Sequence, residues 1–113
     1  MLYISTRGQG DMQPSAHVIK EGLAKDGGLF VPQRFPGIHV DDILALHSRS
    51  YQDCATKILG YFLTDYSAQE LAACTAAAYA AAKFRPEPAP LVKKKKKIDT
   101  LELWHGPTSA FKD

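Results

Sequence analysis

Lys112 is the residue of this sequence that is best placed for covalent chemistry. The run 101–104 alternates like a strand, and the Gly106-Pro107 pair after it must end that strand. Thr108 or Ser109 could then cap a helix, with Lys112 in its first turn. The field at a helix N-terminus opposes an added positive charge, so it favours the neutral amine that a Schiff-base lysine needs. A lysine after a strand end is also a common position for chemistry in open α/β sheets.

Two further polar residues are candidates for binding, and no metal site is expected. Arg7 offers a fixed fork of donors that suits a carboxylate or a phosphate, although it could simply tie the N-terminus to the fold. His105 either braces the turn before Lys112 or approaches a bound cofactor, and bracing is the preferred interpretation. The other histidines have no second ligand at helical spacing: His17, His39 and His47.

The composition is that of a folded domain outside the membrane. Hydrophobic residues make up 45% of the 113 residues, and no apolar run approaches membrane-spanning length. Residues 1–4 are too short for the core of a signal peptide. Cys54 and Cys74 have no partner at metal spacing, so we expect reduced core cysteines and a cytoplasmic protein.

The strongest local charge is the run of five lysines at residues 93–97. The formal net charge is only +2, so the rest of the chain is acidic on balance. Five adjacent lysines repel one another and supply no core residue, which favours a surface loop or a hairpin tip. Contact with nucleic acid is the alternative, but without interleaved aromatic residues it would be weak and salt-sensitive.

Helical and strand signals alternate along the chain. Strands are predicted at residues 2–5, 29–31 and 101–104, and helices at 15–24, 41–47, 51–63 and 67–83. Ile43, Leu44 and Leu46 are expected to be buried. Ser67 and Glu70 have the spacing of a capping box. Alternate prolines make the segment 84–91 stiff and extended. We therefore predict a mostly helical domain over 1–90 and the start of a second domain over 91–113.

Three stretches of this chain resemble motifs of one enzyme family. Residues 101–113 read LELWHGPTSAFKD, which resembles the pyridoxal-phosphate lysine motif of threonine synthases. Residues 3–8 read YISTRG, similar to the YxSTRG of that family, and residues 22–32 read GLAKDGGLFVP, similar to its GLAxDGGLxVP. The matches come in the family's order and extend from one end of the chain to the other. The lysine run departs from the mixed, often acidic turn of family members.

The resemblance implies a fold and a chemistry. The fold class is α+β to α/β, with a small helical N-terminal domain followed by the first strand and helix start of a fold type II pyridoxal-phosphate lyase. Lys112 would hold pyridoxal phosphate through its amine and move the substrate's protons. The reaction implied converts O-phospho-L-homoserine and water to L-threonine and phosphate. Arg7, His105, Thr108 and Ser109 are candidates for binding the substrate.

The resemblance also bears on how complete the enzyme is. A fold type II enzyme needs two α/β lobes around the cofactor, so we expect this chain to be an N-terminal part that is inactive alone. Two alternatives stay open. One is a threonine-synthase-like phospho-lyase that acts on a related amino acid. The other, less favoured, is a small lysine-rich module that binds nucleic acid.

Overall fold

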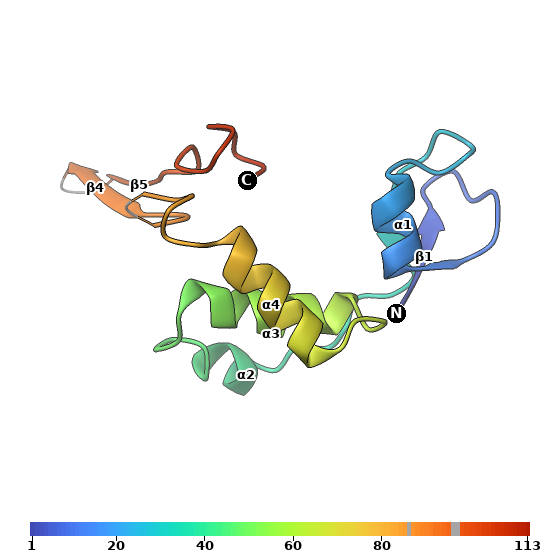
Figure 1. The fold of residues 1–113 in the computed structure, drawn as a ribbon, viewed down its shortest axis with the longest axis horizontal. Coiled ribbons are helices and arrows are strands. Elements are labelled where there is room, and N and C mark those ends of the chain that lie inside the picture. Colours follow the sequence, from blue (N-terminus) through green and yellow to red (C-terminus); the bar gives the residue numbers. More distant parts are fainter. Residues whose placement is uncertain (86, 96–97) are drawn as a thin grey trace. The chain divides into compact units, whose positions relative to one another are not determined.

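The computed structural model describes residues 1–85, 87–95 and 98–113, and for Lys95 only the backbone. The chain divides into two compact units, Met1–Ala73 and Cys74–Asp113. Figure 1 shows the first unit in blue to yellow-green and the second in yellow to red. The boundary expected between residues 90 and 91 concerns the domains of the whole enzyme, and it stays a prediction.

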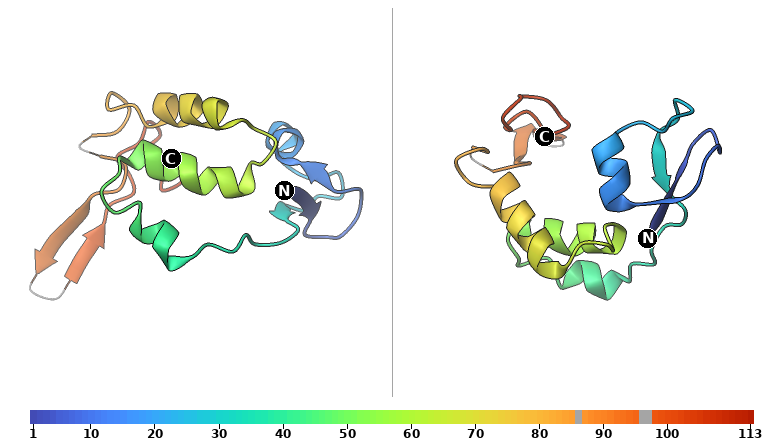
Figure 2. Two further views of the ribbon diagram at one scale, coloured as in Figure 1. Left: turned by 90° about the horizontal axis from the view of Figure 1, so that it is seen from below. Right: turned by 45° about the vertical axis from the view of Figure 1, so that its right-hand side comes forward.

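A three-stranded antiparallel sheet lies at the start of the first unit (Figure 2). Its strands are β1 (Leu2–Ser5), β2 (Gln13–Pro14) and β3 (Phe30–Pro32), in the order β2-β1-β3. The predicted strand at 2–5 is confirmed, and the one at 29–31 begins one residue later than predicted. Tyr3 and Ser5 point to the buried face, as the period of two in a strand requires.

Helix α1 (Ser15–Glu21) packs beside this sheet and ends earlier than predicted. The residue after it, Gly22, takes a φ of 79° and returns its N–H to the carbonyl oxygen of Val18 at 2.9 Å. Because a left-handed residue stops helical propagation, the predicted extension to residue 24 is wrong.

The N-terminus of α1 is capped by a residue far away in the sequence. Pro14 precedes the helix and offers no side-chain oxygen, so the first amides need another acceptor. The Asp65 carboxylate accepts from the backbone N–H of Ser15 at 3.2 Å and of Ala16 at 2.8 Å, and from the Ser15 hydroxyl. Partial burial acts to raise the pKa of Asp65, but these hydrogen bonds outweigh it and hold the pKa below its usual range.

We expect Asp65→Asn to loosen α1 by up to about 1 kcal/mol, because the amide NH2 that replaces one carboxylate oxygen cannot accept a hydrogen bond from Ser15 or Ala16. Because the pKa of Asp65 is lowered in the fold, its contribution is present above the ordinary aspartate pKa of about 3.9 and is lost as the pH falls below that value. Native-state hydrogen exchange of the α1 amides measures this loss. The control is Asp11→Asn, since Asp11 is exposed with no partner among the described residues. Equal exchange in the two variants would contradict this capping role.

Two of the predicted helices follow in the first unit. Helix α3 (Tyr51–Phe62) confirms the prediction within one residue, and the Ser50 hydroxyl caps it by accepting from the Asp53 N–H at 3.1 Å. Helix α2 (Val40–Leu44) is shorter than the predicted 41–47, because the chain tightens into successive turns after it. The expected burial of three residues near α2 is wrong: Ile43 and Leu44 are 56% and 65% exposed, and Leu46 is half-buried. A helix of five residues leaves these side chains at the surface of its unit.

Helix α4 (Ala68–Ala78) begins with the predicted capping box. The Ser67 hydroxyl accepts from the Glu70 N–H at 3.2 Å, and the Glu70 carboxylate accepts from the Ser67 N–H at 2.8 Å. The helix ends at Ala78, five residues before the predicted end at residue 83, and turns follow at residues 81–83. Phe84 is buried there, with its ring centroid 5.5 Å from that of Tyr79.

The second unit contains a two-stranded antiparallel hairpin of β4 (Leu91–Lys95) and β5 (Ile98–Leu101). Part of the lysine run therefore forms a strand of a hairpin, and residues 96–97 lie outside the described part. The predicted strand at 101–104 is wrong, because only Leu101 of that run belongs to β5. Leu101 pairs with Leu91, which is the pair of the ladder farthest from the hairpin turn. Among the described residues, no helix combines the length and apolar character needed to cross a membrane.

Candidate functional site

Lys112 lies in a series of turns and not in a helix. The Ser109 N–H donates to the carbonyl oxygen of Gly106 at 3.1 Å, and Ser109 has a φ of 54°. A residue in this left-handed conformation cannot be the first residue of a helix, so the predicted cap at Thr108 is wrong. A helix capped by Ser109 stays a prediction. Lys112 is exposed, and no described residue forms a hydrogen bond or an ion pair with its amine.

The side chain of Asp113 closes the loop that carries Lys112. Its carboxylate accepts from the Thr108 N–H at 2.8 Å and from the Thr108 hydroxyl. The hydrogen bond from that hydroxyl is the main cause that lowers the pKa of Asp113. Thr108 is thus a brace of the loop in this structure, and its role in binding a substrate stays a prediction, as does that of Ser109.

Gly106 lets the two ends of this loop meet. A Cβ atom built on Gly106 would lie 2.4 Å from the Cβ of Asp113 and 2.5 Å from its Oδ2. Only glycine leaves room for this approach, because real Cβ contacts are not that short. The loop of residues 106–113 therefore closes because Gly106 has no side chain to obstruct Asp113, and the Asp113 carboxylate then binds Thr108.

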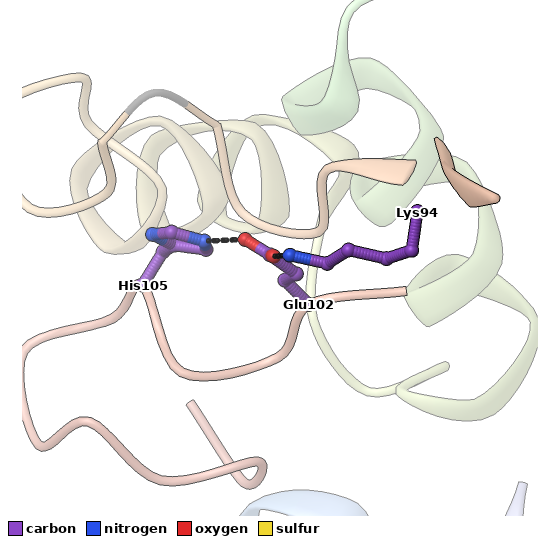
Figure 3. A network of polar contacts seen from close by, with 3 residues as sticks. All are labelled: Lys94, Glu102 and His105. Carbon is purple, nitrogen blue, oxygen red and sulfur yellow. Dashed lines mark hydrogen bonds and ion pairs between the residues drawn. The ribbon is translucent and has the colours of Figure 1, made fainter. Parts of the chain in front are cut away.

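A buried carboxylate holds the chain just before the loop (Figure 3). Glu102 is only 9% exposed, and its two oxygens have different partners. His105 Nε2 lies 2.8 Å from Glu102 Oε2, and Lys94 Nζ lies 3.2 Å from Oε1. The hydrogen bond from His105 is the largest cause of a lowered pKa of Glu102, and the Lys94 ammonium adds to it.

Of His105 and Glu102, only the first was identified as a candidate from the sequence. His105 was expected to brace the turn or to approach a cofactor; the structure shows it bonded to Glu102, and its role toward a ligand stays a prediction. Glu102 was not singled out. The available signal was a single acidic residue within the apolar run 101–104. A carboxylate that is buried in such a run requires hydrogen-bond or charged partners.

Arg7 belongs to the other unit and contacts the DGG turn. Its Nη1 donates to the carbonyl oxygen of Asp26 at 2.8 Å. The Asp26 carboxylate accepts from the Ser5 hydroxyl at 2.7 Å and from the Gly28 N–H at 2.9 Å. The bond from Ser5 is the first cause of a lowered pKa of Asp26. These contacts join the motif of residues 3–8 to the motif of residues 22–32. A role of Arg7 in binding the substrate stays a prediction.

Comparison with known protein families shows to which family this chain belongs. Residues 2–79 match the family model described as "Threonine synthase N terminus". The chain belongs to the threonine synthase family. This agrees with the resemblance of its three motifs, although the model's match ends before the lysine motif at residues 101–113. Among the described residues, no cluster of histidine, cysteine and acidic side chains could hold a metal ion.

Threonine synthases also match the chain over nearly its whole length. It is 37% identical over 114 residues to a threonine synthase of Schizosaccharomyces pombe, covering 98% of this chain and 22% of that protein. It is 36% identical to one of Methylobacillus glycogenes, covering 100% of this chain and 26% of that protein. A solved structure of pyridoxal-phosphate-bound threonine synthase from Brucella melitensis superimposes with a TM-score of 0.87 at 37% identity, covering 99% of this chain and 24% of that one. The chain thus spans about a quarter of the length of these relatives.

Proposed function

We propose that this chain is the N-terminal part of a threonine synthase that converts O-phospho-L-homoserine and water to L-threonine and phosphate. The observation that carries the proposal is the position of Lys112. It stands at the end of the HGPTSAFKD motif, on a loop braced by Thr108 and Asp113, with an amine that no described residue engages. Membership of the threonine synthase family supports the same reaction.

The residues present fit a covalently held pyridoxal phosphate. Covalent attachment requires a primary amine that is accessible and unpaired, and the exposed Lys112 Nζ meets both conditions. When bound, the cofactor supplies an electron sink for the substrate's reacting carbons. The solved relative from Brucella melitensis is described as bound to pyridoxal phosphate, and this supports the same cofactor here.

The chain's own residues have three tasks in this proposal. Lys112 Nζ would hold the cofactor, and its neutral amine would remove and return protons at the substrate carbons. Asp113 and Thr108 keep the loop around Lys112 in one conformation. The hydroxyl of Ser109 has no partner among the described residues and can hydrogen-bond to a polar group of the substrate.

Phosphate release by the full-length enzyme tests the proposed function. The purified enzyme that carries this chain is incubated with O-phospho-L-homoserine, and inorganic phosphate and L-threonine are measured together. Formation of the two products in equal amounts supports the proposal. O-phospho-L-serine is a matched control because it is one methylene shorter. Turnover of another phosphorylated amino acid in place of O-phospho-L-homoserine would favour a threonine-synthase-like phospho-lyase.

The 113-residue chain by itself should show no turnover. It holds the lysine but covers only about a quarter of its relatives, so most contacts to cofactor and substrate are expected on other segments. The same phosphate assay on the isolated chain, supplied with pyridoxal phosphate, measures this. Multiple turnovers per chain would contradict the expectation, and the full-length enzyme is the positive control.

A further inference from the structure

Glu102 lies at the junction between the hairpin and the loop of Lys112. Its backbone N–H donates to the carbonyl oxygen of Pro90 at 3.0 Å, which fixes it beside the start of β4. Its side chain reaches Lys94 on the same strand and His105 three residues later. Figure 3 shows the carboxylate between these two partners. One buried carboxylate therefore joins the lysine run to the entrance of the loop.

The hydrogen bond to Glu102 determines which nitrogen of His105 carries a proton. An ionised carboxylate has no proton to donate, so the Nε2 atom of His105 must be the donor in the 2.8 Å contact. In a neutral imidazole only one nitrogen is protonated, and Nδ1 is then an acceptor. Nδ1 has no partner among the described residues, and Figure 3 shows it on the side of the ring away from Glu102.

Lys94, one of the described lysines of the run, stabilises this arrangement. Its ammonium lies 3.2 Å from the second oxygen of Glu102, a carboxyl side chain that is only 12% exposed. The ammonium adds to the hydrogen bond from His105 in keeping this carboxylate ionised. Lys93, its neighbour, is exposed and does not form such an ion pair with a described residue.

We infer that Glu102 is a positioning residue, which fixes the ring of His105 with its proton on Nε2 and so holds the entrance of the loop that presents Lys112. His105 is followed directly by Gly106, against which Asp113 packs next to Lys112. A shift at His105 therefore moves the end of the loop as well. This inference rests on the proposed role of Lys112 as the cofactor-holding residue.

The first test reads the proton on His105 directly. Nitrogen-15 NMR of histidine side chains in the full-length enzyme distinguishes a protonated from an unprotonated ring nitrogen, and His105→Asn identifies the signals. We expect Nε2 to be protonated and Nδ1 unprotonated in the wild type. In Glu102→Ala, His105 should exchange between the tautomer protonated on Nε2 and the one protonated on Nδ1. A proton found on Nδ1 of His105 in the wild-type enzyme would overturn the inference, even if Glu102→Ala failed to fold.

The second test measures the consequence for Lys112. Glu102→Ala should lower kcat by about 10- to 100-fold with little change in KM, because a small misplacement of a reacting group is costly. The absorbance band of bound pyridoxal phosphate should weaken or shift. Glu102→Gln keeps an acceptor for Nε2 and should restore most of kcat. Lys94→Gln should have a smaller effect of about 2- to 5-fold, and the matched control Lys93→Gln none.

The two tests separate this inference from the proposed function. A wild-type enzyme that neither binds pyridoxal phosphate nor releases phosphate contradicts the function, while the NMR signals still report the proton on His105. A wild-type enzyme that does both, with Glu102→Ala retaining its kcat and its absorbance band, overturns the positioning role alone.

Discussion

Lys112→Ala should abolish covalent binding of pyridoxal phosphate and lower kcat by about 10³-fold or more. The reason is chemical: only a primary amine both attaches the cofactor and transfers protons, and no other described amine stands in the HGPTSAFKD loop. The loop itself should survive, because its bracing comes from Thr108, Asp113 and Gly106. Lys112 is exposed, so truncation leaves no cavity.

The measurement combines reduction with borohydride, peptide mass spectrometry and the phosphate assay, all on the full-length enzyme. In the wild type, the cofactor's mass should be found on the peptide that contains Lys112. Lys83→Ala is a matched control, since Lys83 is an exposed lysine of the same unit and lies outside the loop. Attachment to a different lysine, or a Lys112→Ala enzyme with wild-type kcat, would refute the assignment.

Local signals predicted much of the helical structure. The capping box of Ser67 and Glu70 forms as predicted, because the two residues are only three positions apart in the sequence. The apolar face of α3 gave its bounds within one residue. The motif of Lys112 located the candidate site for the same reason, since its signature lies in nine consecutive residues.

Contacts between distant residues could not be predicted in the same way. Asp65 caps α1 from 50 residues away, and nothing near Ser15 in the sequence points to it. Lys94 forms part of a strand because the pairing of β4 with β5 overrides the repulsion within the lysine run. Positive φ at Gly22 shortened one predicted helix, and positive φ at Ser109 excluded Thr108 as the cap of another. These features depend on tertiary partners, which a single sequence does not display.

Gly28→Ala should be among the most destabilising single changes in the first unit, at about 3 kcal/mol. A Cβ on Gly28 would lie 2.1 Å from Ser5 Oγ and 3.1 Å from the backbone nitrogen of Arg7. Ser5 can only turn away by giving up its 2.7 Å bond to Asp26. Native-state hydrogen exchange in the full-length enzyme should show about 100-fold faster exchange at Thr6, whose N–H bonds to the Leu29 carbonyl oxygen at 2.8 Å.

Two other glycines provide graded controls. Gly37→Ala should change exchange little, because nothing lies within 4 Å of its added Cβ and its φ is not in the left-handed region. Gly27→Ala should cost about 1 kcal/mol, since its φ of 78° is unfavourable for alanine and Arg7 Nη1 lies 3.1 Å from the added atom. The order of effects is thus set by backbone conformation and by the space around each position.

A double-mutant cycle separates steric conflict from a general loss of structure. Ser5→Ala removes the oxygen that the new Cβ would strike, and the remaining neighbours of that atom lie at 3.0 Å or more. Gly28→Ala should therefore cost much less in the Ser5→Ala background than in the wild type, a non-additivity of about 1–2 kcal/mol. Additive effects would mean that Ser5 and Gly28 stabilise the unit independently. The close approach of the STRG and DGG stretches would then not be what requires glycine at this position.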